Sequence, residues 1–145
     1  MLFDRQTRPT MPILPMIGWK EDICLPELGH GKLVAKIDTG ARMSALHAED
    51  ISVIGRRVSF RFAGKDHELK LIGAKRIKSS NGVTQIRPMI ETEIVLGHHR
   101  FEVAITLTDR GDMGVPMLLG REAIKGRFLV NAARSFILDR KRPLK

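Results

Sequence analysis

The sequence predicts an all-β protein, a closed or partly closed barrel with one short helix near its C-terminal end. Three observations lead to this prediction. Short runs of alternating polar and apolar residues recur along the chain, glycine-containing turns separate them, and a helical pattern is confined to residues 122–126. At 145 residues, of which 43% are hydrophobic, the chain is long enough for one domain with its own core. Tyrosine is absent, so the core is expected to consist mainly of aliphatic side chains and methionine.

The first half of the chain contains three predicted strands. Residues 32–37 form an apolar run that ends at a turn, and residues 57–62 alternate polar and apolar side chains, as a half-buried strand does. A turn at Gly64-Lys65 leads into residues 67–72, which alternate in the same way. Residues 45–54 have a mixed pattern that predicts a short strand or a helical turn.

The second half is predicted to consist largely of hairpins. Asn81-Gly82 between two strand-like runs is the strongest short signal for a β-hairpin. A second hairpin turns at residues 97–99, and a loop at 109–114 precedes an apolar strand that breaks at Gly120. In chain order, the predicted strands of this half are 74–78, 84–90, 91–96, 100–107, 117–119, 128–130 and 135–138.

The chain carries a net charge of +9 and has a pI near 10.3. This charge implies an anionic partner: nucleic acid, an anionic surface or an acidic peptide. The one cysteine, Cys24, excludes an internal disulfide and suits a reducing cytosol, so we expect a cytoplasmic protein. No apolar run reaches the roughly 18 residues of a membrane helix, and no membrane partner is expected. We expect a lead-in segment at 1–16, a domain at 17–139 and a basic tail at 140–145.

The most informative feature is the tetrapeptide Asp38-Thr39-Gly40-Ala41, which directly follows the apolar run 33–37. A carboxylate in a tight turn at the end of a strand is the pattern of the catalytic loop of an aspartic protease. A second signal is the run Met117-Leu118-Leu119-Gly120-Arg121, an apolar strand that breaks at a glycine and leads into the predicted helix. Short motifs recur by chance, but these two in this order point to one active site.

With these residues the chain resembles the retropepsin-like aspartic proteases. More narrowly, it is similar to a bacterial DUF785-like family named ATP-dependent zinc proteases, which is associated with the ribosomal-protein glutamate ligase RimK. The narrow match is carried by Ile17-Gly18-Trp19-Lys20-Glu21, Leu25-Pro26-Glu27-Leu28-Gly29 and, above all, Lys36-Ile37-Asp38-Thr39-Gly40-Ala41-Arg42-Met43-Ser44-Ala45-Leu46-His47-Ala48. The resemblance implies a barrel of the acid-protease (retropepsin) type over residues 17–139.

The resemblance also implies that Asp38, Thr39 and Gly40 form the catalytic loop, with Thr39 hydrogen-bonding across the dyad. Peptide hydrolysis by this route needs a water held between two carboxylates, one ionised and one protonated. The chain has a single Asp-Thr-Gly, and neither Asp109 nor Asp139 lies in such a loop. The second carboxylate is therefore expected from another copy of the chain, in a two-fold homodimer.

Other motif residues are expected to hold substrate or to support the loop. The resemblance assigns substrate binding to Ala41, Arg42, Ser80, Asn81 and Gly82, the last three at the tip of a mobile flap. It assigns structural support to Leu119, Gly120 and Arg121. Arg121 would brace the dimer side or pair with a nearby acid.

Arg42 departs from the viral retropepsins, in which the position after Asp-Thr-Gly-Ala is usually acidic. A guanidinium at this position predicts a preference for a carboxylate in the substrate. Together with the net charge of +9 and the RimK association, this indicates acidic peptides or glutamylated proteins as substrates and a RimK-type ligase as a partner.

The family name implies zinc and ATP, but the residues support neither. The chain has no His-Glu-x-x-His motif and no second cysteine. Adjacent residues of a strand point to opposite faces, so His98 and His99 are not expected to share a metal. Gly29-His30-Gly31-Lys32 lacks the length and the terminal hydroxyl of a phosphate-binding loop. We therefore expect no metal and no cofactor.

Two other functions fit parts of the sequence. A retropepsin-like module would bind acidic peptides without cutting them if Arg42 disturbs the dyad. A basic barrel would bind nucleic acid, but single-strand binders combine basic residues with stacking aromatics, and aromatics make up 5% of this chain. The sequence thus favours an aspartic endopeptidase, then a binding module, and disfavours nucleic acid as a partner.

Overall fold

The computed structural model describes residues 13–78 and 82–138. Its helical elements are α1 (Arg121–Ile124) and the 3-10 turns η1 (Pro26–Leu28) and η2 (Gly111–Met113). No helix within these ranges has the length and apolar character needed to cross a membrane. The strands are β1 (Met16–Gly18), β2 (Lys20–Leu25), β3 (His30–Ile37), β4 (Ser44–His47), β5 (Glu49–Ile54), β6 (Arg57–Phe62), β7 (Lys65–Lys70), β8 (Gly73–Lys78), β9 (Thr84–Leu96), β10 (His99–Thr108), β11 (Met117–Leu119) and β12 (Leu129–Asn131).

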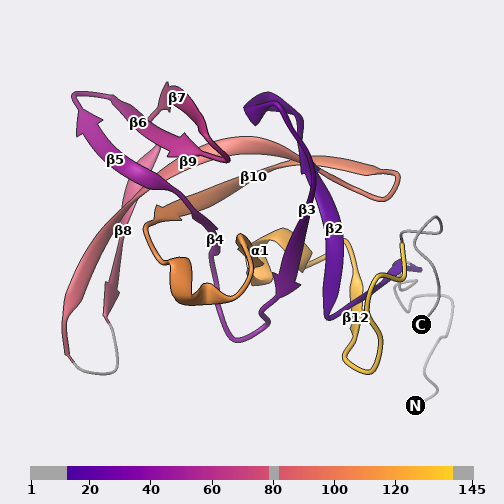
Figure 1. The fold of residues 1–145 in the computed structure, drawn as a ribbon. Coiled ribbons are helices and arrows are strands. Elements are labelled where there is room, and N and C mark those ends of the chain that lie inside the picture. Colours follow the sequence, from indigo (N-terminus) through magenta and orange to yellow (C-terminus); the bar gives the residue numbers. More distant parts are fainter. Residues whose placement is uncertain (1–12, 79–81, 139–145) are drawn as a thin grey trace, which may run out of the picture.

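Six of these strands close into a barrel (Figure 1). Around the ring the order is β10, β4, β11, β3, β2 and β9, and antiparallel pairing of β9 with β10 closes it. β8 extends this sheet as the hairpin partner of β9. Strands β5, β6 and β7 form a second sheet, and β1 pairs in parallel with β12. The barrel and the short helix confirm the predicted fold class.

Aliphatic side chains fill the barrel, as expected for a chain without tyrosine. Burial alternates along β9 because successive side chains of a strand point to opposite faces, and Ile90, Ile94 and Leu96 lie on its buried face. The fully buried side chains of the other barrel strands include Ile23, Leu25, Leu46, Ile105, Leu107, Met117 and Leu119. Removal of this apolar surface from water is the main force that stabilises the barrel.

Two strand predictions need correction because of local geometry. Residues 84–90 and 91–96 form one continuous strand, β9, since no turn residue interrupts the alternation between them. Residues 45–54 form the strands β4 and β5 and no helical turn. Asp50 has a φ of 51°, and the register of β5 on β6 shifts between Glu49 and Ser52. This irregularity explains the mixed pattern, because an extra residue reverses the faces of those that follow.

The predicted closing strand at 135–138 is wrong. Phe136 has a φ of 55°, which is incompatible with an extended strand, and its amide donates to the carbonyl of Lys20 at 2.8 Å. The next two amides, of Ile137 and Leu138, donate to a carboxylate and not to a neighbouring strand. The sequence also gave no separate strand signal for β1 and β2, which the structure shows on either side of Trp19.

Glu21 is the carboxylate that ties residues 137–138 to the barrel. Its side chain is fully buried. Its Oε2 accepts hydrogen bonds from the amides of Gly18 (2.7 Å) and Ile137 (2.9 Å), and its Oε1 accepts one from the amide of Leu138 (3.2 Å). A buried carboxylate is tolerated when it is hydrogen-bonded in this way, and three backbone donors depend on it.

Glu21→Ala is expected to lower the free energy of unfolding by roughly 3 kcal/mol or more, because three backbone donors lose their acceptor. Urea denaturation measures the loss. The matched control is Glu68→Ala, which removes an exposed partner of Arg57 and should cost less than about 1 kcal/mol. Equal losses for the two variants would contradict the role assigned to Glu21.

Candidate active site

The loop that carries Asp38 connects β3 to β4. The amide of Asp38 donates to the carbonyl of Leu119 at 2.8 Å, which extends the pairing of β3 by one residue. Within the turn, the amide of Gly40 donates to Asp38 Oδ1 at 3.0 Å, and the amide of Ala41 donates to the Asp38 carbonyl at 3.2 Å. The Asp38 side chain is half-buried, and Thr39 beside it is exposed. The loop therefore presents a carboxylate at the surface with one oxygen held by its own turn.

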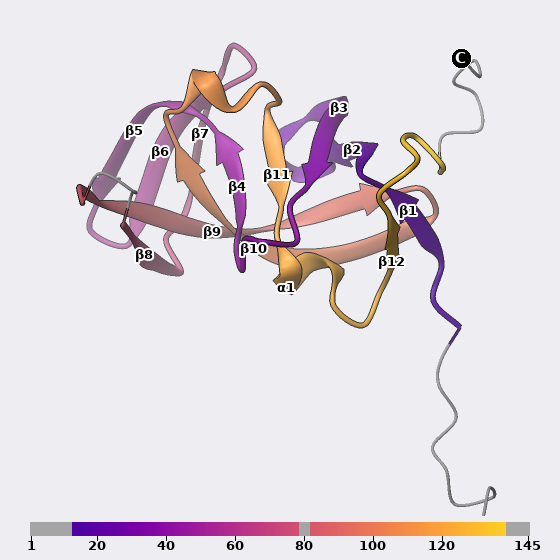
Figure 2. The same cartoon turned by 90° about the horizontal axis from the view of Figure 1, so that it is seen from below.

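Strand β11 lies between the two strands that flank this loop (Figure 2). Leu119 pairs in parallel with Ile37 of β3, and Leu118 pairs antiparallel with Ala45 of β4. Because neighbouring strands lie about 4.8 Å apart, the loop crosses about 10 Å over the end of β11. Both ends of the loop are thus fixed by a strand that is distant in sequence.

Gly120 is the point at which β11 meets the loop. A Cβ at this position would lie 2.5 Å from the carbonyl oxygen of Met43 and 2.8 Å from that of Arg42. The Gly120 amide donates to the hydroxyl of the buried Ser44 at 3.0 Å. Any side chain here would push the loop away from β11, so the close approach requires glycine.

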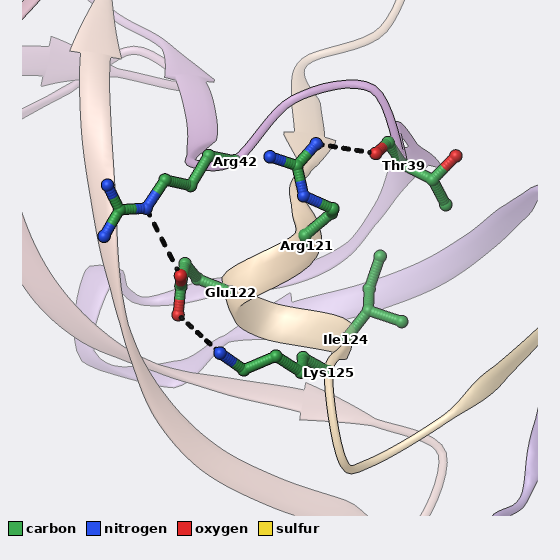
Figure 3. Close-up of a pocket in the computed structure, with 6 residues that line it drawn as sticks. All are labelled: Thr39, Arg42, Arg121, Glu122, Ile124 and Lys125. Carbon is green, nitrogen blue, oxygen red and sulfur yellow. Dashed lines mark hydrogen bonds and ion pairs between the residues drawn. The ribbon is translucent and has the colours of Figure 1, made fainter.

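The start of α1 binds the loop through three further hydrogen bonds. The amide of Arg121 donates to the carbonyl of Ala41 at 2.8 Å, and the amide of Glu122 donates to that of Arg42 at 3.0 Å. Arg121 Nη1 donates to the carbonyl of Thr39 at 2.9 Å (Figure 3). The structure thus gives Arg121 a backbone carbonyl as its partner, where the sequence suggested an acid. The loop backbone is held on both sides.

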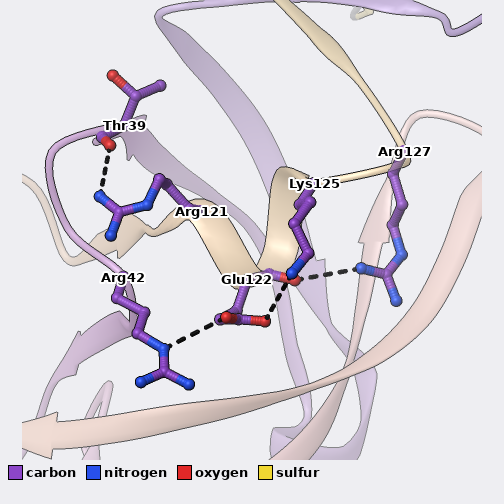
Figure 4. Close-up of polar contacts among 6 residues, drawn as sticks. All are labelled: Thr39, Arg42, Arg121, Glu122, Lys125 and Arg127. Atoms are coloured by element: carbon purple, nitrogen blue, oxygen red, sulfur yellow. Dashed lines mark hydrogen bonds and ion pairs between the residues drawn. The ribbon is translucent and has the colours of Figure 1, made fainter.

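A cavity of about 330 Å³ opens beside the loop. Its lining residues are Thr39, Arg42, Arg121, Glu122, Ile124 and Lys125 (Figure 3). Arg42 Nε contacts Glu122 Oε1 at 3.3 Å, and Lys125 Nζ lies 4.0 Å from Glu122 Oε2. Figure 4 shows the same contacts together with Arg127, whose Nη1 lies 3.4 Å from the Glu122 carbonyl. Three cations and one carboxylate leave the lining with an excess of positive charge.

Glu122 and Lys125 are site residues that the sequence did not predict. Glu122 contacts Arg42, 80 residues earlier in the chain, and Lys125 contacts Glu122, so no local sequence pattern indicates this group of residues. The available signal was the acidic residue directly after Gly120-Arg121, in the first turn of the predicted helix.

The β8–β9 hairpin extends beyond the barrel on the same side as the Asp38 loop (Figure 1). Of the predicted flap residues, Ser80 and Asn81 lie outside the described residues, and Gly82 has a φ of 86°, which favours glycine. Residues 73–89 contain four basic side chains and no acidic one. The hairpin therefore brings concentrated positive charge to the side of the molecule that carries Asp38.

The two faces of this hairpin carry different basic residues. Arg76 of β8 lies opposite Ile86 of β9. Because side chains alternate between the two faces of a strand, Ile86 is on the same face of β9 as Ile90, which is buried in the barrel. Ile86 is 65% exposed, so beyond the barrel that face is open to a ligand. On the other face Lys75 lies opposite Arg87, whose pKa is lowered by burial and by the nearby Arg110.

The described residues do not fit the zinc ion that the family name implies. They contain no group of three histidine, cysteine, aspartate or glutamate side chains placed to hold a metal. The ring of His99 packs edge-on against Phe128 at 5.1 Å between centroids, and His47 Nδ1 accepts a hydrogen bond from the amide of Arg110. Asp38 is engaged with its own turn, as described above.

The architecture and the loop agree with a comparison to known families. The family described as retropepsin-like aspartic endopeptidase RimB matches residues 16–141. The chain belongs to this RimB-like family. The resemblance deduced from the Asp38 and Gly120 motifs is therefore confirmed.

The RimB-like chain is also similar to a segment of longer proteins that are named as ligases. It is 40% identical over 135 residues to a Shewanella halifaxensis protein named probable alpha-L-glutamate ligase, and 33% identical over 128 residues to a Parasynechococcus marenigrum protein of the same name. These matches cover 85% and 80% of this chain, but 30% and 28% of the relatives. The chain thus spans less than a third of the length of these curated relatives.

A solved structure also resembles the RimB-like chain. It is the crystal structure of a Legionella pneumophila protein with unknown function (DUF785), 28% identical, with a TM-score of 0.71. The match covers 86% of this chain and 98% of the Legionella chain.

Gly120→Ala is expected to lower the free energy of unfolding by roughly 1–3 kcal/mol, because its Cβ overlaps the Met43 carbonyl. Thermal unfolding measures the change. Gly31→Ala in β3 is the matched control, since a Cβ there meets nothing within 4 Å and its φ is not positive. Indistinguishable unfolding temperatures for the two variants would show that the loop is not clamped as described.

Proposed function

We propose that this chain is an aspartic endopeptidase that acts as a homodimer and cleaves acidic, glutamate-rich peptides or tails. The observation that carries the proposal is the clamped Asp38 loop, a surface carboxylate whose backbone is held by β11 and α1. Support of this kind keeps a catalytic group in one geometry. Membership of a family described as retropepsin-like aspartic endopeptidases supports the same chemistry.

In the proposed reaction each subunit supplies one Asp38. Two carboxyl groups about 3 Å apart cannot both ionise, so the pair shares one proton. The ionised group takes a proton from a bound water, whose oxygen attacks the scissile carbonyl carbon, and the protonated group gives its proton to the carbonyl oxygen. The C–N bond of the tetrahedral intermediate then breaks: the amine leaves with a proton from the dyad, and one hydroxyl group of the intermediate returns its proton to the dyad as the product carboxyl group forms. No metal or nucleotide takes part.

The remaining motif residues have supporting roles in this proposal. Thr39, exposed beside Asp38, hydrogen-bonds to the loop of the second subunit. The β8–β9 hairpin closes over the substrate and excludes water. Gly82 contacts the substrate, together with Ser80 and Asn81, which lie outside the described residues. Ala41 and Arg42 contact the substrate.

Charge supports an acidic substrate. The cavity lining and the flap segment 73–89 both carry an excess of basic side chains, and the whole chain has a net charge of +9. Relatives that contain a segment similar to this chain are named probable alpha-L-glutamate ligases, and such a ligase would add glutamate to its target. We infer that this chain trims glutamate extensions in the cytoplasm, in association with a RimK-type ligase.

A second candidate function is binding of acidic peptides without cleavage. It is favoured by two cations near Asp38: Arg42 lies in the same loop and contacts Glu122, and Arg121 donates a hydrogen bond to the Thr39 carbonyl of that loop. Binding of nucleic acid receives less support, because Phe60, Phe62 and Phe128 are buried and cannot stack on bases.

Asp38→Asn is expected to reduce cleavage of a glutamate-extended peptide by roughly 10²–10⁴-fold or more, because an amide cannot accept the proton of the water. Mass spectrometry detects the shortened products, and fluorescence anisotropy should show unchanged peptide binding. The control Asp66→Asn changes an exposed surface partner of Arg61 and should cleave normally. Undiminished cleavage by Asp38→Asn would overturn the proposed mechanism; absence of cleavage by the wild-type protein would favour the binding module.

Arg42→Glu is expected to abolish the preference for acidic over neutral peptides, because a cation beside the loop becomes an anion. The measurement is the ratio of kcat/KM values for peptides that differ only in glutamate against glutamine. Arg57→Glu makes the same change of net charge on β6, in the separate sheet, and should leave the ratio unchanged. The same preference before and after the Arg42 substitution would refute this role.

A further inference from the structure

We propose that the cavity beside Thr39 is a subsite for a glutamate side chain of the substrate, in which Arg42 and Lys125 bind the carboxylate and Glu122 orients Arg42. This inference rests on the proposed acidic substrate, and it adds the position of the subsite and two residues that the sequence did not indicate. Glu122 is a positioning residue here, because it acts through Arg42.

Glu122 is joined to Arg42 at two points. Its amide donates to the Arg42 carbonyl at 3.0 Å, which fixes the backbone of the helix to the backbone of the loop. Its Oε1 accepts a hydrogen bond from Arg42 Nε at 3.3 Å, which joins the two side chains. Glu122 thus contacts Arg42 at its backbone carbonyl and at its guanidinium, and we infer that it orients the guanidinium in the direction drawn in Figure 4.

The contact with Glu122 uses the Nε edge of Arg42. In Figure 3 the two terminal nitrogens of the guanidinium point away from Glu122. A planar guanidinium offers a second edge, formed by its two Nη groups, that matches the two oxygens of a carboxylate. Because the Arg42 side chain is 64% exposed, an incoming carboxylate can reach it without displacing Glu122.

Lys125 supplies a second cation at the same cavity. Its Nζ lies 4.0 Å from Glu122 Oε2, at the limit of an ion pair, and its side chain is 76% exposed. A pair this exposed is weak, so the ammonium is free to turn to a substrate carboxylate. Lys125 thus adds electrostatic attraction for the substrate carboxylate, whereas Arg42 sets the orientation in which that carboxylate binds.

The cavity suits a glutamate side chain in size and lining. Its volume of about 330 Å³ lies at the small end of ligand pockets. Ile124 contributes an apolar wall against which the two methylene groups of glutamate can pack, while the cations face the carboxylate. A terminal α-carboxylate has the same charge but no methylene arm, so the lining favours the side chain.

The test compares two substitutions of Glu122 in the non-cleaving Asp38→Asn protein. Glu122→Gln removes the charge but keeps an oxygen that can accept from Arg42 Nε, whereas Glu122→Ala removes both. The probe is a fluorescein-labelled peptide of five glutamates with an amidated C-terminus, and the readout is its Kd by fluorescence anisotropy. A free-acid version of the peptide shows whether an α-carboxylate adds affinity.

We expect Glu122→Gln to bind the probe at least as tightly as its parent, because the local charge becomes more positive. Glu122→Ala should bind at least about threefold more weakly than Glu122→Gln, because a freed guanidinium must be ordered again on binding. Arg42→Lys and Lys125→Met should each weaken binding, since the first removes the two-pronged donor and the second a cation. Glu68→Gln and Glu68→Ala make the same changes at an exposed pair on β7 and should not differ from each other.

Equal affinities of Glu122→Gln and Glu122→Ala would overturn the orienting role, because net charge alone would then explain binding. Unchanged affinity in Arg42→Lys and Lys125→Met would overturn the subsite itself. Both results are read from binding, so a failure of the wild-type protein to cleave peptides would leave them interpretable. Failure of the parent to bind the peptide at all would overturn the acidic-substrate proposal and this subsite with it.

Discussion

The backbone of Gly120 lies against the carbonyls of Arg42 and Met43, and the geometry of the site depends on this contact. It allows β11 to lie between β3 and β4 and brings the first amides of α1 to the loop. A loop is ordinarily the most adaptable part of a fold, yet this one is bound from two directions by residues distant in sequence. The barrel thus holds the backbone around a surface carboxylate through hydrogen bonds from β11 and α1.

Charged side chains are distributed unevenly over the surface of the barrel. The side of the molecule with the Asp38 loop receives basic residues from the loop, from α1 and from the flap segment 73–89. Acidic residues gather instead on the outer face of the β9–β10 hairpin and on η1. There a hydrogen bond to Glu91 and the charges of Glu91, Glu27 and Glu93 raise the pKa of Glu102. The cations on the side of the molecule with the Asp38 loop would match the charge of an acidic polymer.

The parts of the structure that the sequence predicted are those with local signals. The Asp38 turn, the pairing of β8 with β9 and the alternating strands each depend on residues close together in the chain. The predicted strand at 135–138 is absent because Glu21, more than a hundred positions away, accepts hydrogen bonds from the amides of Ile137 and Leu138 in place of a neighbouring strand. Glu122 has no local signal for the same reason, since its partner Arg42 is 80 residues earlier. Long-range side-chain contacts determine the conformation of such segments, and these contacts cannot be recognised in a single sequence.

The central claim, that one carboxylate from each of two subunits forms the active site, is tested most directly by mixing subunits. Wild-type and Asp38→Asn chains are refolded together in varying proportions at constant total concentration, and peptidase activity is measured. If both carboxylates are needed, activity follows the square of the wild-type fraction and falls to about one quarter at equal mixing. Activity that falls in simple proportion, to about one half, would mean that each chain acts alone and would contradict the account.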